Sequence, residues 1–203
     1  MNQQQSHSSE SPSYRQQIRR EYRAKRQALT AKAQQSASEA LLNNVKKHRV
    51  LDGVKTLALY LPNDGELDPS ALIQFAWQHK IQTYLPVLHP FHKQSLLFLH
   101  YDETTQLVPN KYGIPEPRVT CPAICPLSAL DMILTPLVAF DASGNRMGMG
   151  GGFYDRTLAH TSHKTTRIIG LAHDCQEMPQ VPIENWDIPL QTILTPTRLI
   201  MGN

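Results

Sequence analysis

The sequence of 203 residues contains no long apolar run, and no stretch approaches the roughly 18 consecutive apolar residues of a membrane-spanning helix. That absence excludes a protein with membrane-spanning helices. Cysteine is also scarce, since three residues cannot form a disulfide framework and suit a reducing compartment. Residues 1–13, MNQQQSHSSESPS, lack the apolar segment of a signal peptide, so we expect a cytoplasmic protein without a membrane partner.

Apolar residues are nevertheless plentiful enough for one core. They make up 40% of the chain, which excludes wholesale disorder. The length suits one domain, because single domains usually hold about 100–200 residues. We expect a flexible polar tail over residues 1–13 and a single α/β domain over residues 14–203.

Positive charge is concentrated in the first quarter of the chain. Residues 1–50 carry ten Lys and Arg against three Asp and Glu, a net charge of +7, and the remaining residues carry ten against fourteen, a net charge of −4. A basic arm on an acidic body indicates an anionic partner, which is a nucleic acid, a membrane surface or the phosphates of a small ligand. A solvated basic helix explains the same split, and charge alone does not choose between these interpretations.

Strand-like and helix-like segments alternate along the chain. Residues 14–29 contain neither Gly nor Pro and favour a helix, and Thr30 suits the N-cap of a second helix that runs to about Arg49. Asp68 is expected to cap a third helix with Pro69 at its first position. Apolar runs predict strands over residues 54–61, 81–88, 95–101, 132–140, 167–172 and 192–195.

This alternation indicates an α/β layer fold with a largely parallel sheet. The segment 105–130 interrupts it with five prolines, at positions 109, 115, 117, 122 and 126, and we expect a long loop over the sheet there. Loops of such length inside a compact domain often carry function.

The segment 140–156, FDASGNRMGMGGGFYDR, holds five of the ten glycines. It follows a predicted buried strand and leads into an expected helix near Phe153. Glycines let backbone N–H groups turn toward an oxyanion without a Cβ in the way, and the helix start adds its dipole. In an open α/β sheet such a turn lies at the carboxyl ends of the strands, where ligands bind. The segment is therefore a candidate phosphate site.

Charged side chains flank these glycines. Arg146 supplies a planar cation that suits a phosphate, and Asp155 suits Mg²⁺, which prefers carboxylate and phosphate oxygens. The stretch does not match the Walker A pattern, because no Lys-Ser/Thr follows the glycines, and it lacks the GxGxxG spacing of a dinucleotide site. A tight strand-to-helix turn with solvated charges is the alternative interpretation.

The stretch RMGMGGGFYDRTL resembles the Arg-Leu-Gly-x-Gly-x-Gly-Tyr-Tyr-Asp signature of the 5-formyltetrahydrofolate cyclo-ligases, also called methenyltetrahydrofolate synthetases. Four other segments resemble motifs of that family in the same order, and the resemblance covers about residues 14–198. Several separated motifs in the right order make the resemblance far more specific than any one of them. The four segments are GELD (65–68), YGIPEP (112–117), PLVAFD (136–141) and ENWDIPLQTILTP (184–196).

The resemblance implies a function. Members of that family use MgATP to convert 5-formyltetrahydrofolate into 5,10-methenyltetrahydrofolate, with ADP and phosphate as products. The implied route transfers the γ-phosphoryl group to the formyl oxygen, after which N10 attacks the activated carbon. We therefore expect an ATP- and Mg²⁺-dependent ligase that acts on 5-formyltetrahydrofolate, with or without a polyglutamate tail. The implied fold is a three-layer α/β/α sandwich that resembles the ribose-phosphate isomerase and CoA-transferase group.

The resemblance also assigns roles to residues. The catalytic residues at the reacting formyl group would be Arg146 and Tyr154. The ATP phosphates would be held by Arg15, Arg19, Arg146, Gly148, Gly150, Gly151, Gly152 and Tyr154. The folate would be held by Leu61, Glu66, Met149, Gly150, Gly152 and Phe153, without side-chain chemistry from Met149. The metal ion would be held by Asp155 and Asp187.

Three positions depart from the family pattern. Arg15 stands where Lys is common, Phe153 replaces the first Tyr of the Tyr-Tyr pair, and Trp186 stands where His is frequent. The charge at position 15 is kept with a different geometry, and any role of the missing hydroxyl is lost. Glu66 suits a pterin because its carboxylate accepts hydrogen bonds from ring donors, although position alone suggests a surface carboxylate.

Two other functions are open. A non-catalytic nucleic-acid binder would use the basic residues 15–26, but aromatic residues make up only 7% of the chain and no RNA-reading motif is present. A sugar-phosphate isomerase or acyl-CoA transferase rests on fold analogy alone. We expect a monomer without a nucleic-acid partner. The spacing of Cys121, Cys125, His173 and Cys175 does not suit zinc, so no zinc site is assigned.

Overall fold

The computed structural model describes residues 12–159 and 166–202. Residues 1–11, which make up most of the expected tail, lie outside the described residues. Helix α1, Pro12–Gln27, begins two residues before the expected domain boundary. Among the described helices, none combines the length and the apolar character that a membrane crossing requires.

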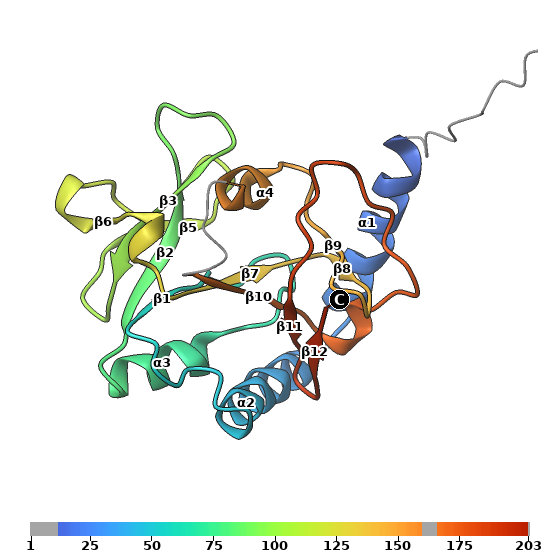
Figure 1. The fold of residues 1–203 in the computed structure, drawn as a ribbon, viewed down its shortest axis with the longest axis horizontal. Coiled ribbons are helices and arrows are strands. Elements are labelled where there is room, and N and C mark those ends of the chain that lie inside the picture. The colour runs from blue at the N-terminus through green and yellow to red at the C-terminus, as the bar shows by residue number, and fades with distance from the viewer. Residues whose placement is uncertain (1–11, 160–165, 203) are drawn as a thin grey trace, which may run out of the picture.

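An eight-stranded sheet forms the centre of the molecule (Figure 1). Its strand order is β12-β11-β10-β7-β1-β2-β3-β6, and the five strands from β11 to β2 run parallel. Strands β12, β3 and β6 pair antiparallel at the two edges. The expected largely parallel α/β sheet is therefore confirmed. Its strands are β1 Thr56–Ala58, β2 Gln82–Leu88, β3 Leu96–Tyr101, β6 Ile124–Cys125, β7 Met132–Pro136, β10 Arg167–Leu171, β11 Thr192–Leu194 and β12 Leu199–Met201.

Helices lie on both faces of this sheet (Figure 1). Helices α2 and α3 pack on one face, where Leu41 and Leu72 join a core cluster with Leu57 of β1. The short helix α4 lies on the other face, where Leu158 packs with Ile133. Because both faces are covered, the central strands read as continuous apolar runs rather than as alternating ones. The three helices are α2 Ala31–Lys47, α3 Ser70–Gln78 and α4 Phe153–Leu158.

The starts of α2 and α3 agree with the sequence prediction, except that α3 begins one residue later than expected. Thr30 caps α2, because its hydroxyl oxygen accepts a hydrogen bond from the N–H of Ala33 at 3.2 Å. Asp68 lies one residue before the N-cap of α3 rather than at the N-cap itself. Its carboxylate accepts hydrogen bonds from the N–H and the hydroxyl of Ser70, and Pro69 is the N-cap rather than the first helical residue.

The expectation of one long loop over residues 105–130 is wrong. The segment contains a β-hairpin, β4 Leu107–Pro109 with β5 Pro115–Pro117, and then the edge strand β6. The carboxamide oxygen of Asn110 accepts two backbone N–H groups and closes the hairpin turn. Proline is tolerated here because this two-stranded ladder is an edge on both sides. Two 3-10 turns, η1 Cys121–Ala123 and η2 Leu127–Ala129, flank β6.

The expected strand over residues 132–140 is two strands. Strand β7 ends at Pro136, the chain bends at Leu137, and β8 Ala139–Phe140 pairs antiparallel with β9 Arg146–Met147. The continuous apolar run concealed this bend, since both halves are buried. The glycine-rich stretch therefore follows a hairpin rather than the central strand itself.

Helix α1 packs against this β8–β9 hairpin. Its Ile18 and Tyr22 are buried in a small cluster with Met147. The hairpin turn is held by the buried carboxylate of Asp141, which accepts hydrogen bonds from backbone N–H groups at positions 143, 145 and 181. This packing brings the basic first helix to the glycine-rich stretch.

Candidate active site

A cavity of about 1220 Å³ opens at the carboxyl ends of β1, β2 and β7. Pockets for one drug-sized ligand usually hold ~300–1,000 Å³, so this cavity is larger than the usual site for one such ligand. All fourteen residues predicted for the site line it. These residues are Arg15, Arg19, Leu61, Glu66, Arg146, Gly148, Met149, Gly150, Gly151, Gly152, Phe153, Tyr154, Asp155 and Asp187.

The glycine-rich loop, residues 148–152, joins β9 to α4 along one wall of the cavity. Gly150 has φ +94°, and an added Cβ would lie 3.3 Å from Cζ of Arg19. The Nε–H of Arg19 donates to the carbonyl oxygen of Gly148 at 2.9 Å, which holds the loop against α1. Helix α4 has only six residues, so an anion bound here would depend on N–H groups and arginines more than on a helix dipole.

Arg19 forms no ion pair with any described carboxylate. Its Nη atoms donate to no described residue, and the side chain lines the cavity. Burial and the neighbouring Arg15 lower the pKa of Arg19, whereas Asp187 raises it. A half-buried cation that forms no ion pair with the described part of the chain favours an anionic ligand beside the glycine-rich loop.

Two other arginines are paired with the carboxylates predicted for the metal. Nη1 of Arg15 lies 2.8 Å from Oδ2 of Asp187, and Nη2 of Arg146 lies 2.6 Å from Oδ1 of Asp155. Arg146 also donates to the carbonyl oxygen of Ile188, which ties β9 to the segment after Asp187. Burial lowers the pKa of Arg146, and the two aspartates oppose this shift. The predicted phosphate-binding and metal-binding groups therefore form one network of alternating charges.

Asp155 suits a divalent cation better than Asp187 does. Both oxygens of Asp187 face Arg15, and Oδ2 also accepts a hydrogen bond from the N–H of Glu184. No described residue donates to Oδ2 of Asp155. The described residues contain no group of three or more side chains that could hold a metal alone, so Mg²⁺ would need phosphate oxygens as well. This donor set fits a cation that arrives with a polyphosphate.

Glu66 lies on the loop between β1 and α3, and its side chain is 13% exposed. Its Oε2 accepts a hydrogen bond from the N–H of Asn63 at 3.2 Å, and its Oε1 lies 3.8 Å from Nη2 of Arg26. Burial raises the pKa of Glu66 to about 7, although Arg26 lowers it. The carboxyl group therefore gains or loses its proton near neutral pH, and its ionised form accepts hydrogen bonds from a ligand.

Tyr154 adds a hydroxyl that lacks a partner. Its oxygen is buried and makes no hydrogen bond with any described residue. Burial raises the pKa of Tyr154, Glu66 raises it further, and Arg146 lowers it. The hydroxyl is therefore protonated, and Tyr154, which lines the cavity, interacts electrostatically with both of these charged groups. Such an arrangement is costly unless a ligand supplies the missing acceptor.

Arg23 and Arg26 belong to the same side of α1 as Arg15 and Arg19, and our sequence reasoning missed them. The four arginines recur at spacings of four, four and three residues, which places them on one helical face. That periodicity is the signal that could have found them. Both missed arginines bind the carboxylate of Asp64, and Arg26 is fully buried.

Exposed aromatic and apolar side chains also gather at the cavity. Tyr112, Met149 and Trp186 are 57%, 50% and 68% exposed, and all three line it. The rings of Tyr112 and Phe153 make an edge contact, with centroids 6.3 Å apart. The β4–β5 hairpin that the sequence did not predict thus supplies one wall, and this wall suits a planar aromatic ligand.

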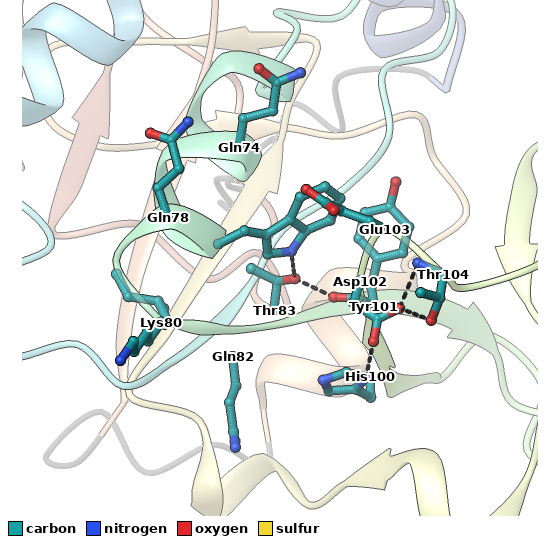
Figure 2. Close-up of a pocket in the computed structure, with 12 residues that line it drawn as sticks. Gln74, Gln78, Lys80, Gln82, Thr83, His100, Tyr101, Asp102, Glu103 and Thr104 are labelled. Carbon is teal, nitrogen blue, oxygen red and sulfur yellow. Dashed lines mark hydrogen bonds and ion pairs between the residues drawn. The ribbon is translucent and has the colours of Figure 1, made fainter.

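A second depression, of about 670 Å³, lies at the amino end of β2 beside α3 and contains none of the predicted site residues (Figure 2). The indole N–H of Trp77 donates to the hydroxyl of Thr83, which in turn donates to the carbonyl oxygen of Tyr101. These groups are satisfied within the protein and offer no unmet hydrogen bond to a ligand. The predicted site residues therefore all lie at the larger cavity and none at this depression.

The fold and the larger cavity define an α/β protein in which a glycine-rich loop and arginines line one large cavity at the carboxyl ends of parallel strands. The model of the 5-formyltetrahydrofolate cyclo-ligase family matches residues 11–196. The chain therefore belongs to this family of enzymes.

Individual relatives agree with this assignment. The chain is 47% identical over 184 residues to the 5-formyltetrahydrofolate cyclo-ligase of Haemophilus influenzae, covering 89% of this chain and 96% of that protein. It is 45% identical over 177 residues to that of Escherichia coli K12, covering 87% and 97%. The solved structure of Aquifex aeolicus 5,10-methenyltetrahydrofolate synthetase matches with a TM-score of 0.79 at 26% identity, covering 92% of each chain.

Proposed function

We propose that the protein converts 5-formyltetrahydrofolate into 5,10-methenyltetrahydrofolate, with consumption of ATP and release of ADP and phosphate. Family membership and the two bacterial relatives support the folate chemistry. One observation carries the ATP half of the proposal. Arg19 is a cation without a carboxylate partner among the described residues, and it is bound to the glycine-rich loop through the carbonyl oxygen of Gly148.

The nucleotide would lie against the glycine-rich loop and the arginines Arg15, Arg19 and Arg146. Backbone N–H groups of the loop and the guanidinium of Arg19 offer donors for the phosphate oxygens. Mg²⁺, held by Asp155 and in part by Asp187, would neutralise charge on the phosphates. Asp155 has one oxygen without a donor among the described residues, which supports this placement.

The folate would lie between Glu66 and the apolar wall that contains Leu61 and Phe153. The ionised carboxyl group of Glu66 would accept hydrogen bonds from the amino and N–H groups of the pterin. The buried hydroxyl of Tyr154 would donate to the substrate, which gives it the acceptor that the described protein does not provide. Its electrostatic interactions with both Glu66 and Arg146 support a position for this donor between the proposed pterin contact and the proposed phosphate contact.

The chemistry needs an activated formyl oxygen, because a formamide is a poor electrophile and its oxygen is a poor leaving group. The γ-phosphoryl group would pass to the formyl oxygen, with a new P–O bond formed as the bond to ADP breaks. N10 of the same folate would then attack the formyl carbon and lose its proton to solvent, while the C–O bond breaks and phosphate leaves. The ring closes within one molecule, so a fixed folate pose supplies much of the rate.

Protein side chains would act by positioning and charge neutralisation rather than as nucleophiles. Arg146 is buried and lines the cavity, so its charge would act on the transferring phosphoryl group in a low-dielectric site. One chain places all fourteen predicted site residues around one cavity, so the proposed monomer needs no residue from a second copy to supply them. The low cysteine content supports a cytoplasmic one.

The contacts made by the basic side chains of α1 argue against the nucleic-acid alternative. Arg15, Arg23 and Arg26 bind carboxylates within the protein, and Arg19 binds the glycine-rich loop. The remaining Lys25 pairs with Glu21 on the same helix. The basic side chains of residues 15–26 are therefore bound within the protein, with Arg20 as an exposed exception.

The proposed reaction is tested by mixing purified protein with 5-formyltetrahydrofolate and MgATP. Methenyl product is followed by its near-ultraviolet absorbance, and ADP is measured in the same samples. We expect one ADP for each methenyl product and no product with the non-hydrolysable β,γ-imido analogue of ATP. Product formation at the same rate without ATP, or ADP release that does not depend on the folate, would contradict the proposal.

A further inference from the structure

Arg26 on α1 is a fully buried arginine, 0% exposed. A buried guanidinium is costly unless its charge and its N–H groups are matched. Its Nε donates to the carbonyl oxygen of Asp64 at 2.8 Å, and its Nη2 donates to Oδ2 of Asp64 at 2.7 Å. Its Nη1 donates to the carbonyl oxygen of Leu137 at 3.0 Å, and Nη2 also lies 3.8 Å from Sδ of Met149. One side chain thus joins three segments of the cavity wall.

The first of these segments is the loop that carries Glu66. Asp64 and Gly65 have φ of +53° and +73°, so the chain turns sharply just before Glu66. A Cβ on Gly65 would lie 3.2 Å from the backbone of Arg26, which shows how closely the loop approaches α1. The carboxylate of Asp64 also accepts hydrogen bonds from the side chains of Arg23 and Gln27. The loop is therefore fastened to the last turn of the helix.

The second segment is the bend between β7 and β8. The carbonyl oxygen of Leu137 accepts a second hydrogen bond, from Nε2 of Gln176 at 2.7 Å. Gln176 belongs to the 3-10 turn η3, Asp174–Gln176, and its Oε1 accepts from the N–H of His173. The oxygen that receives Arg26 is thus held in place from the other side. Arg26 can therefore hold the Glu66 loop against this oxygen, whose position is fixed by Gln176.

The third segment is the glycine-rich loop, which Arg26 reaches through Met149. We assigned no side-chain chemistry to Met149 from the sequence. Its sulfur is a weak acceptor for the guanidinium of Arg26, while half of the residue remains exposed at the cavity. The buried arginine therefore contacts both the loop proposed for the pterin and the loop proposed for the phosphates.

Arg26 also sets the charge around Glu66, since its Nη2 lies 3.8 Å from Oε1 of that residue. The other titratable groups that face Glu66 come from its own loop, from the end of β1, from α4 and from the segment before η3. They are Asp64, Tyr60, Tyr154 and His173. Among all the described titratable groups that face Glu66, Arg26 is the permanent cation.

We propose that Arg26 is a positioning residue for the folate half of the site, which holds the Glu66 carboxyl group in place by tying its loop to α1 and to the bend after β7. Arg26 does not line the cavity, so it acts through Asp64 and Glu66 rather than on the substrate. The inference rests on the proposed function, because it assigns Glu66 to the pterin.

The test compares Arg26→Lys and Arg26→Met with the neighbouring exposed variant Lys25→Met. Lysine keeps the charge of Arg26 but cannot form its planar set of hydrogen bonds, and methionine removes both. Affinities for 5-formyltetrahydrofolate and for MgATP are measured separately by calorimetry, each without the other ligand. Amide hydrogen exchange of residues 62–67 is measured on the same proteins, and so is the pH profile of kcat/KM for the folate.

We expect Arg26→Lys to weaken folate binding by about tenfold or more, as for the loss of hydrogen bonds to a charged group. ATP affinity should change by less than threefold, and amide exchange in residues 62–67 should accelerate. Arg26→Lys should leave the acid limb of the pH profile in place, whereas Arg26→Met should move it upward by about one unit, because the nearby cation is lost. Lys25→Met should match the wild type in every measurement.

The inference is overturned if Arg26→Lys binds the folate within twofold of the wild type, or loses affinity for both ligands equally. It is also overturned if exchange in residues 62–67 is unchanged. If Arg26→Met does not fold, Asp64→Asn replaces it, because this variant weakens the same fastening from the loop side. Wild-type protein that fails to bind the folate would defeat the proposed function, and the exchange rates would still decide whether Arg26 holds the loop.

Discussion

The arginines on the inner face of α1 differ in their electrostatic surroundings, and these differences separate the ion-paired arginines from Arg19. Arg15 is paired with Asp187, and Arg26 is buried against Asp64. Arg19 lies between them on the helix and has no carboxylate partner among the described residues. The sequence could place Arg15 and Arg19 at a phosphate site by resemblance. It could not show which cation is free, because the carboxylates that neutralise the others lie far away in the chain.

Arg19→Met should therefore impair ATP binding selectively. A hydrogen bond to a charged group is worth about 1.5–3 kcal/mol, so we expect the KM for ATP to rise roughly 10- to 100-fold. The KM for the folate should change by less than threefold. Steady-state kinetics with each substrate varied in turn measure both values.

Arg20→Met is the matched control for that change, because Arg20 is the exposed neighbour on the same helix. It should keep both KM values within twofold of the wild type. If Arg20→Met raised the KM for ATP as much as Arg19→Met, the general charge of α1 would explain binding and Arg19 would have no specific role.

At the scale of one element, sequence patterns indicate the turn in the loop between β1 and α3 but not the contacts of this loop with α1. Residues 62–65, Pro-Asn-Asp-Gly, are of types typical of turns, and the structure has a turn at Asp64 and Gly65. Its docking on α1 was not predictable, since the contacts depend on where the helix packs. The same limit applies to residues 105–130, where prolines suggested a loop and pairing between β4 and β5 made a hairpin.

Gly65→Ala should damage the site more than Gly113→Ala does. Both glycines have a left-handed backbone, with φ of +73° and +76°, so each alanine costs roughly 1–2 kcal/mol of stability. A Cβ at Gly113 meets nothing within 4 Å, but one at Gly65 lies 3.2 Å from the backbone of α1. Gly65→Ala should therefore lose at least about 1 kcal/mol more and push the Glu66 loop outward.

Urea denaturation and calorimetric titration measure these two effects. Gly113→Ala should keep the folate affinity of the wild type, while Gly65→Ala should weaken it at least tenfold. Equal losses of stability and unchanged folate affinity in both variants would mean that the loop does not depend on its contact with α1.

At the scale of the whole molecule, alternation of apolar runs and helix formers was sufficient to predict the α/β layers and the parallel centre of the sheet. The break between β7 and β8 was hidden, because a run that is buried throughout shows no change of pattern at Leu137. The buried network around Arg26 was hidden too, since an arginine in a basic helix looks solvated until its partners are placed. Local patterns thus gave the layers, and long-range pairing decided the interior of the site.

The folded protein also keeps Glu66 in surroundings that disfavour its charge. The pKa of Glu66 is about 7 in the folded protein, against roughly 4.3 for an unperturbed glutamate. Between these values the folded state binds more protons than the unfolded state, so this group lowers stability as pH rises from about 4 to about 7. The cost is fully present above pH 7, where the ionised carboxylate would be available for the proposed contact with the pterin.

Glu66→Gln should therefore become more stable relative to the wild type as pH rises. We expect the difference in unfolding free energy, variant minus wild type, to increase by on the order of 1–3 kcal/mol between pH 4 and pH 8. Folate binding should weaken at the same time. Urea denaturation at several pH values measures the difference, and Glu103→Gln at an exposed glutamate should give a flat line. A flat line for Glu66→Gln would show that the carboxyl group is not disfavoured by burial.

The central claim is that the glycine-rich loop holds a polyphosphate directly beside the pterin. A crystal structure of the wild-type protein with 5-formyltetrahydrofolate and the β,γ-imido analogue of ATP tests it most directly. We expect the γ-phosphate against residues 148–152 and the guanidinium of Arg19, the formyl oxygen next to that phosphate, and the pterin donors on Glu66. A nucleotide bound outside the cavity, or a pterin that does not contact Glu66, would contradict the claim.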